Sequence, residues 1–560
     1  MVQARNVGIR PKSSRLLRLF LSVMQRQTDP GRESPHQAGS GGFNFLSGVF
    51  VALLLGICIL YFYRILIHHD VAYFLVQSQR MAAGDRLYVD IVDFNPPMIH
   101  LWALPPVLIS EVFGWSIAPL FYLYVSLALV GSAWLCSPMM TLIYPQLPST
   151  HRIFLIFGIL FCLFPLALEH FGQREHLFFA FFLPYLFQSF ACSSGRKPPK
   201  LLSLVSGILA AIGLCFKPYF VLPFMAVELF VFSRQRASYT LRRWDLAGLV
   251  CVLAVYVGTI LIVFPRYLDC VRLAQSLYAA YDTTVLKSIA KPQVYWFAPI
   301  LPVIWIFKAP SVRDRSLYLL LAAVMGAFLL MAVVQKKGWD YQYYPLLALE
   351  AFFVAVFLVR QLHHWGMFET LRLGIPGVLL LSLCGFALSI ASYLLGPAGA
   401  RSNDSLLKEY LLPAVSECAK GRPMYVLSTS LYPGWTMVLH SGARWPYRHA
   451  SLWFLPEVYR SRPNRAPGAP VYNEPGSMPD RERLFYSQVV EDLIEHPPSL
   501  LMIDKGIWKQ GLAVEFDYEA YFRQDSSFSR LLAGYRCVAN IAAFDLYVPS
   551  EPSAAAGSHP

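Results

Sequence analysis

The chain has 560 residues, of which 56% are hydrophobic and only 14% are charged, and this composition excludes an ordinary soluble protein. Its 47 basic and 34 acidic residues give a formal net charge of +13, but the basic residues lie mostly in short loops between apolar runs. That distribution is typical of membrane-protein topology and not of a nucleic-acid-binding surface.

Residues 1–42 are basic and polar, and we expect them to form a disordered cytoplasmic tail, since they lack the apolar core of a signal peptide. A transmembrane domain is expected over 43–396, because apolar runs of about twenty residues recur there. We expect about eleven membrane-spanning helices, near 43–65, 115–136, 152–170, 177–195, 201–217, 218–233, 244–264, 294–308, 316–334, 343–360 and 374–396. The expected fold class is therefore an α-helical polytopic membrane protein.

The segment Pro96–Phe113 is also apolar, but the positive-inside rule argues against its spanning the membrane. If it spanned, the two densest basic loops, 196–200 and 234–243, would lie outside. Read as a helix on the outer surface, bent at Pro105 and Pro106, it leaves the main basic loops inside. This arrangement predicts a protein of the plasma (inner) membrane with a cytoplasmic N-terminus and an extracytoplasmic C-terminal domain.

The external loop 66–114 carries two carboxylates that the sequence places at the membrane surface. Asp70 directly follows the first apolar run, and Val71–Ala83 has the spacing of an amphipathic helix lying along the interface. Asp93 stands shortly before a Pro-Pro pair, which forces an extended entry into the next helix. The plain alternative is a solvated loop with ordinary acidic residues, in which Asp70 merely caps the interfacial helix.

Several ionisable and aromatic residues fall on the same predicted side as this loop. They are Arg174, Glu175, His176, Lys217, Lys336, Lys337, Trp339 and Tyr341. Each has an ordinary explanation: a lysine at a helix end can be a snorkelling anchor, Arg174 and Glu175 can form a local ion pair, and the aromatic residues can form an interfacial belt. Because ionisable groups at membrane depth are expensive and usually functional, their convergence on one face predicts a single site there.

The chemistry of this site follows from the residue types present. The sequence contains no P-loop, no GxGxxG after a strand, no HExxH and no GxSxG motif, so a donor carried in the lipid fits better than a nucleotide. Sugar transfer from such a donor requires a base for the acceptor hydroxyl and cations for the departing phosphate. We expect Asp70, ahead of Asp93, to be the catalytic base. The residues named in the previous paragraph are expected to bind the donor, with the Lys336-Lys337 loop holding its phosphate and Lys217 and Arg174 assisting.

An ordered set of short motifs runs through this part of the chain. They are Asp70-x-x-Tyr73, Gly84-Asp85-x-x-Tyr88, Asp93-x-x-Pro96-Pro97 with Trp102, Arg174-Glu175-His176, and Lys336-Lys337-Gly338-Trp339-x-Tyr341. The set resembles the GT-C glycosyltransferases, in the branch of the protein O-mannosyltransferases and lipid A aminoarabinose transferases, over roughly residues 45–360. Many relatives have Glu-Lys-Pro-Pro where this chain has Phe94-Asn95-Pro96-Pro97. The resemblance implies a GT-C fold and a transferase that uses a polyprenyl-phosphate sugar.

The last part of the chain predicts a small extracytoplasmic α/β domain over 397–550, followed by a disordered tail over 551–560. Strand patterns occupy 424–429, 499–504 and 537–548, with a helix over 486–496. Cys418 and Cys537 both fall in this domain, and their spacing leaves open whether they form a disulfide. No CxxC or Cys/His metal spacing is present, so the sequence indicates no cofactor and no metal ligands, and a divalent metal stays an open alternative.

These observations predict a glycosyltransferase that moves a sugar from a polyprenyl-phosphate-linked donor to an acceptor hydroxyl on the outer face of the membrane. Its expected partners are that donor, the lipid bilayer and an external glycan, lipid or protein acceptor, with no nucleic acid. One alternative is a polyprenyl-lipid or glycolipid transporter (flippase), which should show discontinuous helices at mid-membrane and paired repeats. A second alternative is an assembly subunit whose external domain binds partners.

Overall fold

The computed structural model describes residues 66–167, 170–298, 309–366, 405–459, 472–506 and 516–550, with a few isolated positions between them. The expected tails 1–42 and 551–560, the expected spans 43–65 and 374–396, and much of the span expected at 294–308 lie outside the described residues. All described residues belong to one compact unit, Cys58–Pro560. The structure is that of an α-helical polytopic membrane protein with a small C-terminal sheet domain.

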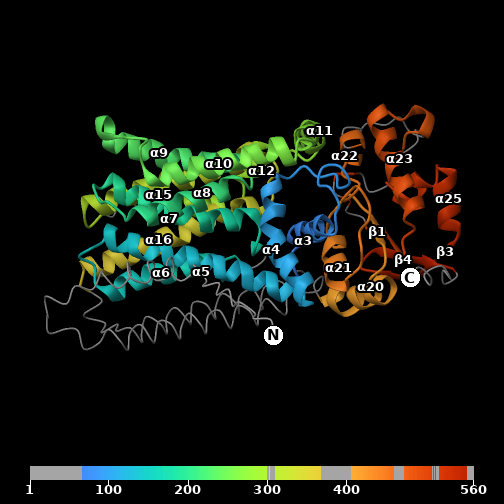
Figure 1. Cartoon of the computed structure of the whole chain (residues 1–560), viewed down its shortest axis with the longest axis horizontal. Coiled ribbons are helices and arrows are strands. Elements are labelled where there is room, and N and C mark those ends of the chain that lie inside the picture. Colours follow the sequence, from blue (N-terminus) through green and yellow to red (C-terminus); the bar gives the residue numbers. More distant parts are fainter. Residues whose placement is uncertain are drawn as a thin grey trace, which may run out of the picture. The chain divides into compact units, whose positions relative to one another are not determined.

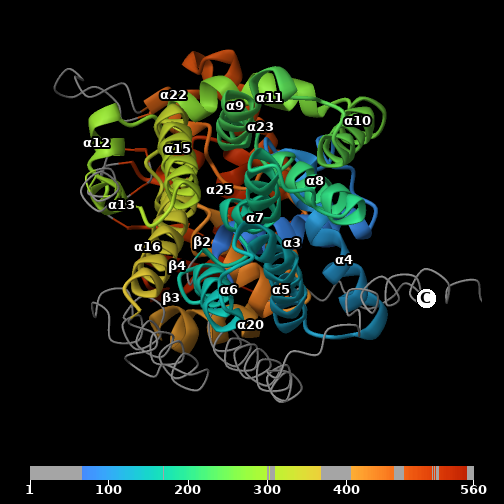
Figure 2. The same cartoon turned by 90° about the vertical axis from the view of Figure 1, so that its left-hand side faces the viewer.

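Eight helices of the described chain fall in the ranges expected for membrane spans and lie side by side (Figure 1, Figure 2). They are α5 (Ile117–Ile143), α6 (Ser149–Leu163), α7 (Arg174–Ser193), α8 (Lys200–Leu214), α9 (Val221–Gln235), α10 (Trp244–Val263), α15 (Val312–Gln335) and α16 (Tyr344–His364). Five segments of the described chain are long and apolar enough to cross a membrane: α5, α7, α10, α15 and the run Asp340–His364. Helices α6, α8 and α9 are shorter, with 15 residues each.

Helix α7 packs against α5, α8, α9 and α16. Its side chains are apolar on nearly every face, and all of them are buried from Arg174 to Ala191, as expected for a helix surrounded by others. The helix begins at Arg174 and not at 177 as the apolar pattern predicted. The polar run Arg174-Glu175-His176 therefore forms its first turn and is buried with it.

Polar side chains at the other end of α7 form a closed ion-pair network. Arg243 donates to Glu228 at 3.0 Å and to Asp245 at 2.6 Å, and it also contacts Ser189 near the end of α7. Tyr185 donates to the same Glu228 carboxylate. These ion pairs and hydrogen bonds connect α7, α9 and α10 to one another.

Two further helices precede the bundle: α3 (His69–Ala82) and α4 (Pro97–Phe113). Helix α4 starts at a proline in its first turn and ends at Gly114, whose φ of 67° is the left-handed conformation that glycine tolerates. It runs across the direction of the bundle helices (Figure 1, Figure 2). Val112 and Phe113 at its end are 75% and 62% exposed, which fits the predicted surface helix.

Helix α3 corrects the sequence-based prediction of an amphipathic helix on the membrane surface. Its residues Val71–Ser78 are buried, because α4 and α21 (Gly434–Ser441) of the C-terminal domain both pack on it. The rings of Tyr73 and Trp435 meet edge to face at 4.8 Å in this contact. The periodicity of α3 indicated one apolar face correctly, but it could not indicate that a segment far along the chain would cover the helix.

The connection between α10 and α15 contains α11 (Tyr267–Ala279), α12 (Val285–Ile289) and α13 (Pro292–Phe297), and a 3-10 turn, η5 (Asp340–Tyr343), precedes α16. The chain then resumes in the α/β domain. Its described helices are α20 (Leu412–Ala419), α21, α22 (Leu455–Tyr459), α23 (Asp480–Glu495), α24 (Tyr518–Phe522) and α25 (Ser526–Ala533).

The sheet of the α/β domain has the strand order β1-β2-β4-β3. Its strands are β1 (Met424–Leu427), β2 (Leu500–Asp504), β3 (Tyr535–Ile541) and β4 (Phe544–Pro549). β1 and β2 pair in parallel with Met424 opposite Leu500, and β4 pairs antiparallel with both β2 and β3. The three predicted strand patterns fall on β1, β2 and the β3–β4 hairpin, whereas the helix predicted over 486–496 begins earlier, at Asp480. Cys418 and Cys537 are both free thiols, so they form no disulfide in this structure.

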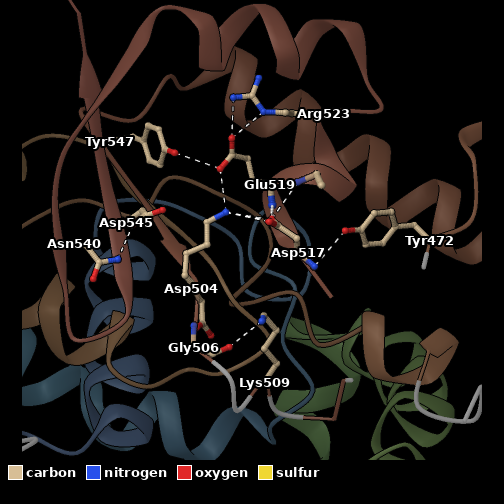
Figure 3. Close-up of polar contacts among 12 residues, drawn as sticks. Tyr472, Asp504, Gly506, Lys509, Asp517, Glu519, Arg523, Asn540, Asp545 and Tyr547 are labelled. Atoms are coloured by element: carbon tan, nitrogen blue, oxygen red, sulfur yellow. Dashed lines mark hydrogen bonds and ion pairs between the residues drawn. The ribbon is translucent and has the colours of Figure 1, made fainter. Parts of the chain in front are cut away.

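An ion-pair network holds α24 against the end of β2 (Figure 3). Lys505 donates to Asp517 at 3.2 Å and to Glu519 at 3.1 Å. Glu519 also accepts hydrogen bonds from Arg523 and Tyr547. Each charge has an opposite partner, so this cluster stabilises the domain.

Candidate active site

A cavity of about 380 Å³ lies where the helical part meets the α/β domain. Its described lining comes from the start of α3 and of α7, the end of α11, the segment before α16 and the loops after β1 and before α22. The lining residues are His68, His69, Asp70, Tyr73, Phe74, Asn95, His170, Arg174, Leu277, Tyr278, Tyr281, Gly338, Trp339, Asp340, Tyr341, Thr429, Ser430, Leu431, Ala450, Ser451 and Trp453. The cavity thus joins the loop 66–114 to segments more than 350 positions later in the sequence.

Hydrogen bonds across this junction close the cavity. The backbone N–H of Ile67 donates to His440 Nε2 at 2.9 Å, and the Thr436 hydroxyl donates to the Ile67 carbonyl at 3.0 Å. The N–H of Val92 donates to the Arg448 carbonyl at 2.9 Å. The α/β domain therefore forms one wall of the site.

Asp70 lies in the first turn of α3 and lines the cavity, with 14% of its side chain exposed. Burial raises the pKa of its carboxyl, but His69, His68 and the cation of Arg174 act in the opposite direction and leave that pKa below its usual value. The capping alternative does not hold, because the side chain that caps α3 is His68, whose Nδ1 accepts the Asp70 N–H at 3.2 Å.

Asp93 occupies a different environment from Asp70 and is absent from the described cavity lining. Its side chain is fully buried, and one oxygen lies 2.5 Å from His100 Nε2. The other oxygen accepts the N–H of Phe94, the N–H of Asn95 and the Asn95 side-chain amide. Burial raises the pKa of Asp93, but the bond to His100 and those to Asn95 hold it below its usual value.

A short hydrogen-bond chain connects Asp93 to the cavity. Asn95, held by Asp93, accepts a hydrogen bond on its Oδ1 from Arg174 Nη1. The Arg174 guanidinium also lies over the Phe74 ring, 5.1 Å from its centroid. Asp93 is therefore a positioning residue for Arg174 and does not itself line the cavity in the described chain.

The other residues predicted at the site near the start of α7 lie behind the cavity lining or in the protein interior. Lys217 Nζ forms an ion pair with Glu175 at 2.5 Å and lies 5.0 Å from the centroid of the Tyr341 ring, behind the cavity lining. His176 is fully buried, and both ring nitrogens are used: Nδ1 accepts the Gly172 N–H and Nε2 donates to the Leu163 carbonyl. His176 thus holds the turn before α7, and this position does not fit the predicted contact with donor phosphate.

In the predicted phosphate loop before α16, the aromatic residues line the cavity and the two lysines do not. Trp339 and Tyr341 line the cavity. Lys337 instead donates to Asp282 at 2.5 Å and to the Tyr278 carbonyl, and so ties down the segment after α11. Lys336 is exposed, has a positive φ of 54° at the end of α15, and is absent from the described cavity lining. The structure therefore does not place the two lysines where the sequence predicted the phosphate.

Three histidines that the sequence analysis left without a role line the cavity: His68, His69 and His170. Burial, followed by the neighbouring His69, lowers the pKa of His68 to about 3, and burial also lowers the pKa of His69 and of His170. His68, His69 and Asp70 each offer one ligand atom, and these atoms lie within 4.8 Å of one another. The available signal was the His-His-Asp run directly after an apolar segment.

Comparison with known proteins gives a structural match only. No protein-family model matches the chain, and no curated protein matches its sequence. A crystal structure of ArnT from Cupriavidus metallidurans bound to undecaprenyl phosphate matches with a TM-score of 0.54 and 13% identity, covering 93% of this chain and all of that one. The apo structure of the same protein matches with a TM-score of 0.51 and 15% identity over 91% of this chain and 98% of that one.

The chain has the GT-C fold. The match extends over both the helical part and the α/β domain, so the fold implied by the short motifs is confirmed. The segment around the start of α3 and the α/β domain meet at the cavity, with Asp70 and Arg174 on its wall.

Asp93→Ala tests the buried pair. The substitution leaves His100 and the Asn95 amide without their acceptor, and removal of one partner of a buried pair typically costs about 3–5 kcal/mol. We expect a clear drop in the thermal unfolding midpoint of the purified protein. Asp90→Ala is the control, because Asp90 pairs with Arg86 on the exposed surface and such pairs contribute little. Equal midpoints for the two variants would contradict the positioning role.

Proposed function

We propose that the chain is a glycosyltransferase that moves a sugar from a polyprenyl-phosphate-linked donor to an acceptor hydroxyl on the outer face of the membrane. The observation that carries this proposal is a cavity that presents a carboxylate, Asp70, and a buried cation, Arg174, in a fold shared with ArnT. A crystal structure of ArnT holds undecaprenyl phosphate. The same lipid-phosphate chemistry fits the cavity described here.

Arg174 is the group best suited to hold the donor phosphate. Only 7% of the residue is exposed, and its Nε has no hydrogen-bond partner among the described residues. A guanidinium presents several donors in a fixed plane, which suits phosphate oxygens, and its charge is poorly screened at such a buried position. This assignment replaces the predicted one to Lys336 and Lys337. Lys217 and Glu175 stand behind Arg174 as an ion pair.

Asp70 is the proposed base. It lies in the first turn of α3 and lines the cavity, where its carboxylate can accept a proton from a bound hydroxyl group. A hydroxyl is a weak nucleophile toward the anomeric carbon, so proton removal during attack accelerates transfer. The same carboxylate stabilises positive charge that develops on the sugar as the phosphate leaves.

The acceptor enters from the wall that the α/β domain provides. Thr429, Ser430, Ser451 and Trp453 line this side of the cavity. This placement puts the acceptor opposite the residues of α3 and α7. A transporter would need its substrate site near mid-membrane, whereas this cavity lies at helix starts beneath a folded domain.

Asp70→Asn tests the base. Asparagine keeps the size and polarity of the side chain but cannot accept the proton, so transfer should fall by at least about a hundredfold while donor binding persists. The measurement is transfer from a polyprenyl-phosphate sugar in reconstituted vesicles, with Asp85→Asn as a matched control on the same loop. Near-normal turnover by Asp70→Asn would remove Asp70 from the base role.

Arg174→Gln tests the phosphate site. Loss of a charge-assisted contact in a shielded position should weaken donor affinity by about tenfold or more, since such contacts contribute about 1.5–3 kcal/mol. Donor affinity is measured by titration with a polyprenyl-phosphate sugar. Lys336→Met removes an exposed charge of the same sign outside the cavity and should bind donor like the wild type. If Lys336→Met lowered donor affinity and Arg174→Gln did not, the phosphate site would lie at the Lys336-Lys337 loop instead.

Outer-face orientation is tested by cysteine labelling in intact cells. Ser238, between α9 and α10, and Ser477, in the α/β domain, are both exposed. In a background that lacks the exposed Cys251 and Cys537, an impermeant thiol reagent should label Ser477→Cys but reach Ser238→Cys only after permeabilisation. Labelling of both variants in intact cells would contradict the orientation.

A further inference from the structure

The α/β domain contributes only uncharged residues to the described lining of the cavity. They are Thr429, Ser430, Leu431, Ala450, Ser451 and Trp453. The lysines that follow β2 are already bonded. Lys505 pairs with Asp517 and Glu519, and Lys509 donates to the Gly506 carbonyl (Figure 3). Because a phosphate or carboxylate in a shielded site needs a cationic partner, this wall favours an uncharged acceptor.

Three groups on this wall keep hydrogen-bonding capacity for a ligand. Ser451 is only 3% exposed, yet its hydroxyl forms no hydrogen bond within the described chain. The Ser430 hydroxyl accepts the N–H of Tyr432 at 3.1 Å, and its own proton has no acceptor among the described residues. The same holds for the indole N–H of Trp453. Buried polar groups normally have a partner, so these groups are suited to a molecule bound in the cavity.

Both loops of this wall are held at the carboxyl ends of the parallel strands β1 and β2, where open α/β sheets commonly bind ligands. Asp504, the last residue of β2, accepts the Ser428 hydroxyl and the Gly506 N–H, each at 2.9 Å. Ser428 Oγ in turn accepts the N–H of Ser430 at 3.0 Å, and the Ser428 carbonyl accepts that of Leu452 at 2.9 Å. Asp504 is therefore a positioning residue for the loop after β1 and the loop before α22.

We propose that Ser430, Ser451 and Trp453 form the acceptor subsite and that this subsite binds an uncharged sugar residue of a glycan. Hydroxyl and indole N–H groups can bond to the hydroxyls of a sugar, and an indole ring offers an apolar surface to the C–H face of a sugar ring. Peptides are commonly recognised through backbone hydrogen bonds, but the N–H groups of Ser430 and Leu452 are already used. A peptide acceptor therefore fits this wall less well.

The role of this subsite in transfer rests on the proposed function. A hydroxyl oxygen of the bound sugar forms a bond to the anomeric carbon of the donor. The bond from that carbon to the phosphate oxygen breaks, the phosphate keeps the electron pair, and Asp70 accepts the hydroxyl proton. The products are a glycosidic bond between two sugars and the free polyprenyl phosphate.

Sugar binding is tested on the full-length protein in lipid nanodiscs by saturation-transfer difference NMR. The probes are the methyl glycosides of glucose, galactose, mannose and N-acetylglucosamine. We expect at least one glycoside to be saturated on its C–H face. Trp453→Leu should weaken its binding by tenfold or more, and Ser451→Ala by severalfold. Trp365→Leu, at an exposed tryptophan at the end of α16, should bind like the wild type.

Saturation of none of the glycosides, or wild-type affinity in Trp453→Leu, would overturn the proposal. Stronger saturation of glycerol 3-phosphate or of a short seryl peptide than of every glycoside would also overturn it. Unfolding midpoints of all variants are measured, and Trp453→Leu is replaced by the milder Trp453→Phe if it does not fold.

The same titration tests the positioning role of Asp504. Asp504→Ala should weaken glycoside binding by about tenfold and leave the affinity for a polyprenyl-phosphate sugar unchanged, because the donor lies against Arg174. An equal loss of both affinities would mean that Asp504 only stabilises the domain.

Transfer activity separates the subsite from the transferase. A glycoside bound at Trp453 without transfer from any polyprenyl-phosphate sugar would keep the sugar-binding subsite and contradict the proposed function. Transfer that proceeds unchanged in Trp453→Leu would keep the transferase and overturn the subsite.

Discussion

The buried contact between Asp93 and His100 is the interaction on which the cavity depends. A carboxylate without any exposed surface is stable only when its hydrogen bonds replace those to water. Here His100, two backbone N–H groups and the Asn95 amide provide those bonds. The turn that leads into α4 is fixed as a result, and Asn95 is presented to Arg174. A group that does not touch the cavity thereby sets the orientation of its only described arginine.

The second constraint is the covering of α3 by the α/β domain. The contacts of Ile67 with His440 and Thr436 join the beginning of the described chain to α21. They convert what would be a surface loop into one wall of an enclosed site. Enclosure matters for the chemistry, because charges act on each other more strongly when water is excluded. The partial burial of Asp70 and Arg174 is therefore a consequence of domain packing as much as of helix geometry.

Clusters of charge elsewhere in the molecule show why pairing must be known before function is inferred. Arg243 with Glu228 and Asp245, and Lys505 with Asp517 and Glu519, are as dense as the groups at the cavity. Each of these charges has an oppositely charged neighbour, so such networks hold elements together. The cavity differs because it brings a carboxylate, Asp70, and a buried guanidinium, Arg174, to one enclosed space.

The sequence by itself determined the helical membrane fold, the α/β domain and the presence of Asp70 and Arg174 at one site. The length of an apolar run, the alternation of a strand and the order of short motifs are local properties of the sequence. They can be recognised without knowledge of the tertiary contacts. Only the tertiary structure decided which polar groups face the cavity. Lys337 pairs with Asp282, His176 bonds to backbone groups and Asp93 bonds to His100. None of these pairings could be read from the spacing of residues in the sequence. His68 and His69 enter the site because α21 covers α3, and a contact between residues more than 350 positions apart leaves no periodic signal in the chain.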